Sequence, residues 1–257
     1  MIIAKWDSNK AAYGYIGSSE SSSGVDQTAR NNISDHIADS DVHVTADEKA
    51  AWNAINYSNP NLLDNSNFLV NQRGGTEWTT GTSSAYFVDR WGSSRANLSL
   101  TDDGLLFSWN GSDGSNGWLS QTVDVSSFLG EKVAISLKVN GKIYTVTAVT
   151  TTTMTIKTID DVNLKIALSY TGNNCNALII QTSSTEPVTI KWVKMELGDH
   201  NTAFVSPDPA TELAKCQRYY QIRSTGDVAA VDLRPTMRVT PTVTHLSDGN
   251  YSYSADF

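Results

Sequence analysis

The sequence predicts a mostly β protein: a jelly-roll β-sandwich with a short N-terminal helix and a small C-terminal β segment. Two observations lead to this fold class. Of the 257 residues only 18% are charged and 39% are hydrophobic, while Thr, Ser, Asn and Gly are abundant, as exposed antiparallel sheets and their turns require. The apolar residues also come in short clusters of strand length, separated by turn residues, and not at helical spacing.

Composition and pattern divide the chain into four parts. Residues 1–34 form an N-terminal segment that contains a Ser/Gly linker, 35–59 a helical module, 60–206 the sandwich and 207–257 the C-terminal β segment. The linker is the run GSSESSSG at 17–24. We interpret it so because such a run buries too little apolar surface to become ordered.

The N-terminal helix is predicted over residues 46–55. Thr45 and Glu48 form a Thr-x-x-Glu capping box in front of it. A helix of this length is marginal in water by itself. We therefore expect it to pack on the β body or against copies of itself in a trimer.

A cluster of histidine and aspartate precedes that helix. His36 and His43 flank Asp39 and Asp41, and imidazole and carboxylate groups are zinc and nickel ligands. Such residues in a polar turn more often cap backbone N–H groups or face water, so we predict no metal site. A jelly roll can hold a structural calcium ion through loop oxygens, but the sequence locates no such ligands, and we expect no other cofactor.

The β body begins after Pro60, which breaks the preceding helix. Alternation of apolar and polar residues is clearest over 143–148, which predicts a strand with one buried and one solvated face. The turn residues at 102–104 and 248–249 predict hairpins. The hairpin around 248–249 leaves an edge that an intermolecular partner would cover.

The run VTIKWVKMEL at 188–197 is predicted to be a late core strand that closes the two-sheet sandwich. Strict alternation would place Ile190, Trp192 and Lys194 on one face, and Val193 and Met195 on the other. We interpret Trp192, like Trp91 in another strand-like run, as part of the core.

Charge and hydropathy exclude several classes of partner. The formal net charge is -8 and the pI is about 4.9, so we expect neither nucleic acid nor an anionic membrane as a partner. No apolar run suits a signal peptide or a membrane span, which predicts a soluble protein made in the cytoplasm. Cys175 and Cys216 match no metal spacing; the sequence leaves their pairing open, and two buried free thiols is the simpler expectation.

Catalysis is not expected. No nucleophile elbow, dinucleotide loop, Walker loop or HExxH motif is present in the sequence. A glycosidase needs only two suitably placed carboxylates, and six are nominally available, but aspartates in the loops of a β protein usually serve turns. These six are Asp89, Asp102, Asp103, Asp113, Asp124 and Glu196.

Sugar binding is the better functional hypothesis. Sugars stack their CH faces on aromatic rings and offer hydroxyl groups to Asn, Asp, Gln and Arg. The loop FSWNGSDGSNGWLSQ has this composition, and another tryptophan lies in a Gly/Thr-rich loop. The alternative, favoured for any single tryptophan, is a place in the sandwich core. The candidate carbohydrate-binding residues are Trp109, Asn110, Asp113, Asn116, Trp118 and Trp78.

Two arginines near Trp91 offer another hypothesis. Arg90 and Arg95 carry the charge that an acidic sugar requires. We favour a structural role instead, in which Asp89, Arg90 and Trp91 form an ion pair and a stack.

Several motifs resemble tail-fibre and receptor-binding proteins of phages and prophages. They are NLLDNSNF, VNQRG and DRW within 61–91, VKMELGDHNTAF at 193–204, and ELAKCQRYY at 212–220. The resemblance covers roughly 35–238. Proteins of that family often continue well beyond the segment that resembles PTMRVTPTV at 235–243, which leaves the completeness of the C-terminal part open.

The resemblance implies a function in virion attachment. It implies a homotrimeric fibre or tip on the phage tail, bound to other tail or baseplate proteins, with a carbohydrate-binding jelly roll that adheres to host cell-surface polysaccharide. It carries over no catalytic residue. The alternatives are an architectural tail or baseplate component without sugar binding and, less favoured, a polysaccharide-degrading tailspike.

Overall fold

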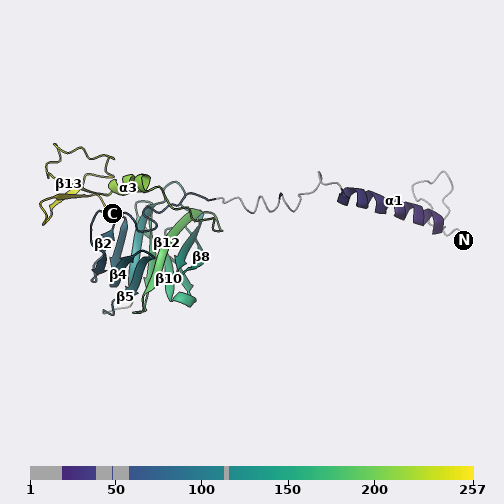
Figure 1. The fold of residues 1–257 in the computed structure, drawn as a ribbon, viewed down its shortest axis with the longest axis horizontal. Coiled ribbons are helices and arrows are strands. Elements are labelled where there is room, and N and C mark those ends of the chain that lie inside the picture. The colour runs from purple at the N-terminus through teal and green to yellow at the C-terminus, as the bar shows by residue number, and fades with distance from the viewer. Residues whose placement is uncertain (1–18, 39–47, 49–57, 113–115) are drawn as a thin grey trace. The chain divides into compact units, whose positions relative to one another are not determined.

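The computed structural model describes residues 19–38, 48, 58–112 and 116–257 (Figure 1). The chain divides into two compact units, Met1–Asn56 and Tyr57–Phe257. In the first unit, helix α1 spans Ser19–Ala38.

Helix α1 differs from the sequence interpretation, because it takes in most of the 17–24 run that was expected to be a linker. Serine costs a helix only a few tenths of a kcal/mol relative to alanine, and a single glycine about 1 kcal/mol, so a long helix can contain the run. Of the predicted helix over 46–55, only Glu48 lies within the described residues, and it is helical.

The second unit is dominated by two antiparallel six-stranded sheets. The first, sheet A, has the order β1 (Glu77–Thr79), β4 (Ala96–Thr101), β5 (Gly104–Trp109), β12 (Val188–Leu197), β7 (Lys132–Val139) and β8 (Lys142–Val149). The second, sheet B, has the order β2 (Ala85–Val88), β3 (Trp91–Ser94), β6 (Gly117–Asp124), β11 (Cys175–Thr182), β10 (Leu164–Gly172) and β9 (Thr155–Ile159). A short 3-10 turn, Asp160–Val162, follows β9.

The strand order confirms the predicted sandwich class. The chain crosses from one sheet to the other six times, after β1, β3, β5, β6, β8 and β11. As a result β12 lies between β5 and β7, while β11 lies between β6 and β10. Such crossing connections are the Greek-key pattern of jelly rolls.

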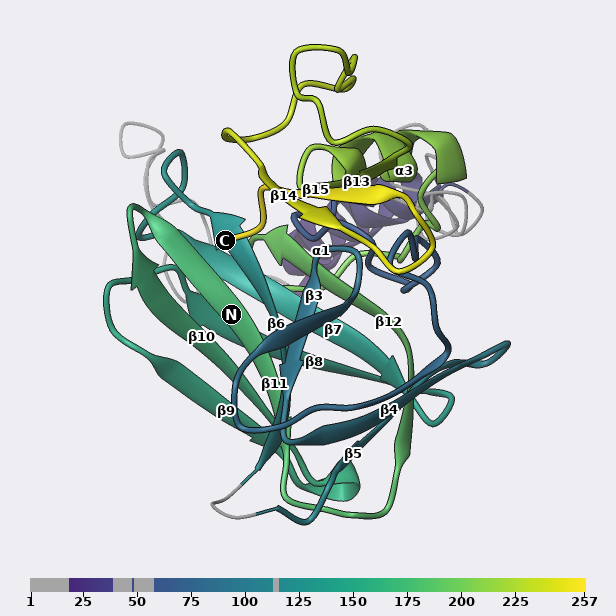
Figure 2. The same cartoon turned by 90° about the vertical axis from the view of Figure 1, so that its left-hand side faces the viewer.

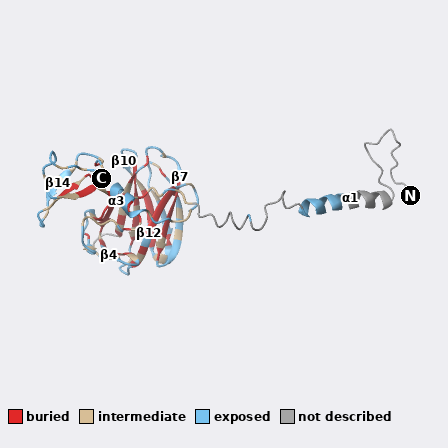
Figure 3. Ribbon diagram, turned by 45° about the horizontal axis from the view of Figure 1, so that its top comes forward, coloured by how far each residue is buried: buried red, intermediate tan, exposed pale blue. Residues whose placement is uncertain are grey.

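The core lies between the two sheets, where the buried residues gather in Figure 3. Trp91 is fully buried and its ring lies 5.2 Å from that of Phe68, which confirms its predicted place in the core. Its indole Nε1 donates a 2.9 Å hydrogen bond to the backbone oxygen of Asn65, so the one polar atom of the ring is satisfied.

Residues 61–66 run along β12 without forming a strand of their own. The Asn61 side chain accepts from the Met195 N–H and donates to the Val193 oxygen, at 3.0 and 3.1 Å. Asn65 is fully buried and its amide donates to the oxygens of Val70 and Asp89, both at 2.8 Å. Asn61 thus adds to two backbone bonds that join this segment to β12, from the Leu62 N–H to the Met195 oxygen and from the Val193 N–H to the Ser66 oxygen, both at 2.8 Å.

The C-terminal part adds helix α3 (Pro209–Gln217) and a three-stranded sheet over one end of the sandwich (Figure 2). That sheet has the order β13 (Tyr220–Arg223), β15 (Tyr251–Ser254) and β14 (Thr242–His245), which confirms the hairpin predicted around 248–249. Asp208 caps α3 by accepting from the Thr211 N–H at 2.8 Å.

Arginine–aromatic stacks join this C-terminal part to the sandwich. The Arg90 guanidinium lies 3.6 Å from the ring centroid of Tyr219, and that of Arg73 lies 3.9 Å from the ring centroid of Tyr220. Arg90 is buried, and its ion-pair partner is Asp64, at 3.0 Å, rather than the neighbouring Asp89. The predicted structural role of Arg90 therefore agrees with its contacts, although its partner differs.

Both cysteines are buried and unpaired, as expected. Burial raises the pKa of the Cys216 thiol well above its ordinary value, so it stays protonated. None of the helices in the described part of the chain is long and apolar enough to cross a membrane.

Candidate functional site

The loop predicted to bind sugar lies at the end of the sandwich where β5 passes into β6. Trp109 ends β5, Trp118 is near the start of β6, and both are half-buried. Gly117 allows the two strands to approach: a Cβ there would lie 2.7 Å from the Arg95 oxygen and 2.9 Å from the Trp109 Cα. Backbone packing therefore holds the two tryptophans at strand ends and not on a free loop.

The Asn110 side chain serves the fold, whereas Trp109 Nε1 and Ser112 Oγ are buried without a hydrogen-bond partner among the described residues. The Asn110 amide donates to the Thr80 oxygen at 2.7 Å, and its side-chain oxygen accepts from the Ser112 N–H at 2.9 Å. Asn116 is half-buried, and Asp113 lies outside the described residues. Asn110 is thus a turn-building residue, which leaves less hydrogen-bonding capacity for a sugar than the sequence indicated.

Trp78 belongs to β1 and packs against the core. Its ring meets that of Phe87 edge-on, with centroids 5.5 Å apart. It also lines a hollow of about 400 Å³ at the edge of sheet A, together with Ser108, the residue before Trp109. Most contacts of Trp78 are therefore those of a core residue, which is the alternative to sugar binding that the sequence left open.

A second aromatic surface lies on the outer face of sheet A. The Trp192 and Phe204 rings are parallel, with an interplanar angle of 2° and centroids 4.5 Å apart. They line an open groove of about 550 Å³, which we call the Trp192 groove. Its lining residues are Asn67, Phe68, Leu69, Asn71, Leu100, Thr101, Asp102, Gly104, Lys191, Trp192, Phe204 and Ser206.

A β-bulge explains why the sequence did not indicate this groove. The bulge between Ile190 and Trp192 shifts the register of β12 against β7. Ile190 consequently shares the core with Val193 and Met195, whereas Trp192 and Lys194 face outward. The expectation that Ile190 and Trp192 share a face is therefore wrong. Trp192 is buried, as predicted, but it lies outside the cluster of core residues that contains Ile190.

Gly104 shapes one wall of the groove. It begins β5, directly after the turn from β4, with a φ of +132°, and a Cβ there would lie 2.5 Å from the Ile190 oxygen. Only glycine permits this close approach of the turn to β12. The approach brings exposed Asp102 of the turn and exposed Lys191 of β12 into the same lining.

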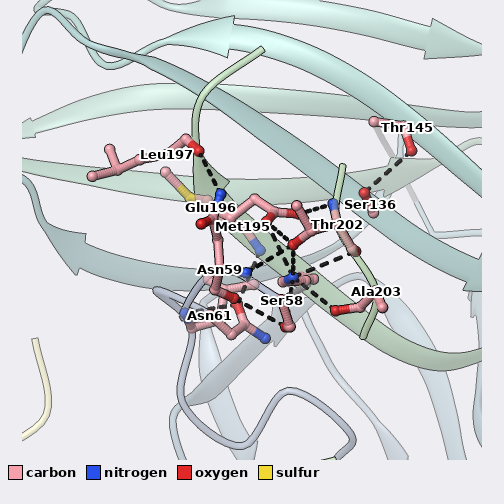
Figure 4. Close-up of polar contacts among 12 residues, drawn as sticks. Ser58, Asn59, Asn61, Ser136, Thr145, Met195, Glu196, Leu197, Thr202 and Ala203 are labelled. Atoms are coloured by element: carbon pink, nitrogen blue, oxygen red, sulfur yellow. Dashed lines mark hydrogen bonds and ion pairs between the residues drawn. The ribbon is translucent and has the colours of Figure 1, made fainter. Parts of the chain in front are cut away.

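A buried ion pair anchors the segment that precedes Phe204, and Figure 4 shows Glu196, Thr202 and Ala203 of this cluster. The Lys194 Nζ lies 3.1 Å from a Glu196 carboxylate oxygen and donates to the Ala203 oxygen at 2.9 Å and to Thr202 Oγ1 at 2.7 Å. Both charged side chains are almost wholly buried. Because Thr202 and Ala203 directly precede Phe204, these bonds fix the segment that carries the outer ring of the stack.

The environment of Glu196 keeps it ionised. Burial by itself would raise its pKa, but hydrogen bonds from the Thr202 hydroxyl and N–H and from Lys194 outweigh burial and lower the pKa. Glu196 is thus a structural anion, which is inaccessible to a substrate.

The other nominally catalytic carboxylates fall into two groups. Asp102, Asp103 and Asp124 are exposed, whereas Asp89 is fully buried. Asp89 accepts hydrogen bonds from the Gln72 N–H at 2.6 Å and from the Gln72 side chain at 3.1 Å. Burial raises the pKa of Asp89 to about 6, although those two bonds and Arg73 lower it, so a substrate-accessible role is not indicated.

The Asp89 carboxyl makes stability depend on pH in an uncommon direction. A folded-state pKa of about 6, against 3.8 for the ordinary group, means that the native state binds the proton more tightly. The contribution of the Asp89 carboxyl to the free energy of unfolding is fully present below about pH 4 and is lost as pH rises through 6. We expect the difference in unfolding free energy between wild type and Asp89→Asn, from urea titrations, to fall by roughly 2.5 kcal/mol between pH 4 and 7.5.

The control for this prediction is Asp124→Asn. Hydrogen bonding from Ser126 lowers the pKa of Asp124. The difference in unfolding free energy between wild type and Asp124→Asn should therefore rise with pH, if it changes at all. A difference for Asp89→Asn that stays constant with pH would contradict the prediction.

Metal ligands were considered around His36 and His43. His36 lies in α1, whereas His43, Asp39 and Asp41 are outside the described residues. Within the part of the chain that the structure describes, no three histidine, cysteine or acidic side chains are grouped so as to hold a metal ion.

Comparisons of this chain with protein-family models, curated proteins and solved structures give no match. The function is therefore inferred from the motifs and from the geometry of the site.

Proposed function

We propose that this protein is a phage tail-fibre or receptor-binding protein that attaches the virion to host cell-surface polysaccharide through a non-catalytic β-sandwich. Motifs such as NLLDNSNF and VKMELGDHNTAF support the phage assignment by resemblance. The sandwich fold is compatible with it, since jelly rolls include many lectin domains.

The observation that carries the glycan-binding proposal is the Trp192 groove. The stacked pair of Trp192 and Phe204 supplies an apolar platform, and Phe204 is the more accessible of the two rings. Around it lie two exposed charged groups that suit sugar hydroxyls, the Asp102 carboxylate and the Lys191 ammonium. An aromatic surface with a few convergent polar groups is the usual composition of a sugar site.

A homotrimer anchored to other tail or baseplate proteins would display three such grooves together. Each groove is open to solvent, so a single groove would hold a sugar weakly. Linked sites raise the overall affinity by factors of about 10² to 10⁴ when all can engage at once. Multivalent display therefore suits attachment to a repetitive polysaccharide.

Replacing groove residues is expected to weaken glycan binding. On a glycan array with the full chain, Phe204→Ala should reduce the signal for the bound glycan about tenfold, because one stacked ring is lost. Asp102→Asn should also weaken it and, being exposed, should leave thermal unfolding unchanged. The comparison variant is Trp109→Ala/Trp118→Ala, which alters the loop predicted from the sequence and leaves the groove intact.

The outcomes separate the proposal from its alternatives. Binding that is lost in the folded loop variant but retained in both groove variants would move the sugar site to 109–118. A trimeric wild type that binds no glycan would favour an architectural tail component. Shortened oligosaccharides after incubation with host polysaccharide would favour a tailspike.

A further inference from the structure

A pocket of about 810 Å³ lies where the C-terminal part meets the sandwich. The sandwich contributes residues from the end of β6 and from the turn between β10 and β11, including Thr122 and Asn173. The other side contributes Arg218, Tyr219 and Arg238. The pocket shares no lining residue with the Trp192 groove.

The charge lining this pocket is opposite in sign to that of the whole chain. The side chains that line it include two guanidinium groups, of Arg218 and Arg238, and one carboxylate, that of Asp124. The chain as a whole carries a formal net charge of -8. A local excess of positive charge in an acidic protein favours an anionic ligand over a neutral or cationic one.

The two arginines differ in how they are held. Arg238 donates to the backbone oxygens of Ala255 and Asp256, both at 3.1 Å, and its guanidinium lies 4.0 Å from the ring centroid of Phe257. Arg218 is exposed, and its guanidinium has no hydrogen-bond or ion-pair partner among the residues that the structure describes. Arg238 is thus preorganised, while Arg218 is available to a ligand.

Aromatic rings complete the pocket. Tyr219 and Phe257 both line it, with ring centroids 5.9 Å apart. Buried Arg90 stacks against Tyr219 and so fixes its ring. Hydroxyl and amide groups of Thr122 and Asn173 lie in the same lining. Rings, guanidinium groups and neutral polar groups together match a sugar ring that bears an anionic substituent.

We propose that this pocket binds an anionic saccharide, with the carboxylate or phosphate of the sugar on Arg218 and Arg238 and the sugar ring against Tyr219 and Phe257. A guanidinium presents a planar fork of N–H donors that suits either anion. Carboxylates occur in uronic-acid polymers and phosphates in sugar phosphodiesters, so the two sources share this chemistry. The pocket is a second saccharide site, separate from the Trp192 groove.

The test uses saturation-transfer NMR and calorimetry on the full chain in 150 mM NaCl. The probes are D-glucuronate and D-galacturonate for the carboxylate, glucose 1-phosphate for the phosphate, and D-glucose as the neutral reference. We expect at least one anionic probe to bind and D-glucose not to bind. Arg218→Ala should weaken that binding about tenfold, because a charge-assisted hydrogen bond is lost.

Two control variants make the result decisive. Arg234→Ala removes the same charge from an exposed ion pair with Asp232 and should leave binding unchanged. Phe204→Ala alters only the Trp192 groove, so its effect on a glycan array is independent of the anionic probes. Absence of binding by all three anionic probes, or equal losses in Arg218→Ala and Arg234→Ala, would overturn the proposal without touching the proposed function of the groove.

Discussion

Replacing Arg90 by alanine is expected to lower the free energy of unfolding by about 3 kcal/mol or more. The side chain is only 3% exposed, and it makes three contacts that alanine cannot replace. Its Nε pairs with Asp64 at 3.0 Å, its Nη2 donates to the Thr122 oxygen at 2.9 Å, and its plane stacks on Tyr219. Without them, the half-buried Thr122 carbonyl loses this donor, the Asp64 carboxylate loses its cation, and a cavity remains.

Urea unfolding and limited proteolysis measure this effect separately. Because Arg90 connects the sandwich to Tyr219, we expect the C-terminal part to become protease-sensitive before the sandwich does. The free energy of unfolding of Arg90→Lys should lie between those of wild type and Arg90→Ala. Lysine keeps the positive charge but lacks the guanidinium's forked N–H donors and its stacking on Tyr219. Arg234→Ala, in an exposed pair, should show no measurable change. Equal stability of Arg90→Ala and Arg234→Ala would show that the stack contributes nothing.

Replacing Lys194 by alanine is expected to cost about 3 to 5 kcal/mol of stability. The substitution leaves Glu196, which is fully buried, without its 3.1 Å cationic partner. It also removes the donor to the Thr202 and Ala203 backbone oxygens, so the segment before Phe204 loses its anchor. Glycan binding at the Trp192 groove should therefore fall together with stability.

A double replacement tests the reason for this cost. Lys194→Met combined with Glu196→Leu removes both charges and should recover much of the lost stability, because no buried charge stays unpaired. Lys142→Ala is the matched surface control: its ion pair with Asp161 is exposed, and no measurable loss is expected. A Lys194→Ala protein as stable as Lys142→Ala would mean that Glu196 gains water or a proton at little cost.

Local pattern was enough to predict the fold class and several elements. Alternation over 188–197 located β12, and Asp248-Gly249 located the last hairpin, because each depends on residues that are neighbours in sequence. The partners of β12 do not follow from its own pattern. They depend on chain crossings between the sheets, which are decided by the packing of the whole core.

The aromatic surface was predicted less well, for a local reason. Composition drew attention to Trp109 and Trp118, since polar residues surround them in sequence. The bulge in β12 adds one residue to an otherwise regular alternation, and only pairing with β7 reveals it. The sequence pattern therefore predicted Trp192 to be a core residue. No pattern indicated a role for Phe204, because it lies outside any strand.

The position of β12 between β5 and β7 has a consequence for biosynthesis. Sheet A cannot close until residues 188–197 have been made, because β5 and β7 pair with β12 and not with each other. Until then the emerging chain exposes two apolar strand edges, which are sites for wrong pairing between nascent chains. Pairings this distant in sequence also fold slowly, on a scale of about milliseconds to seconds. Sheet A is thus completed late in synthesis, and the appearance of β12 decides when the open edges of β5 and β7 become paired.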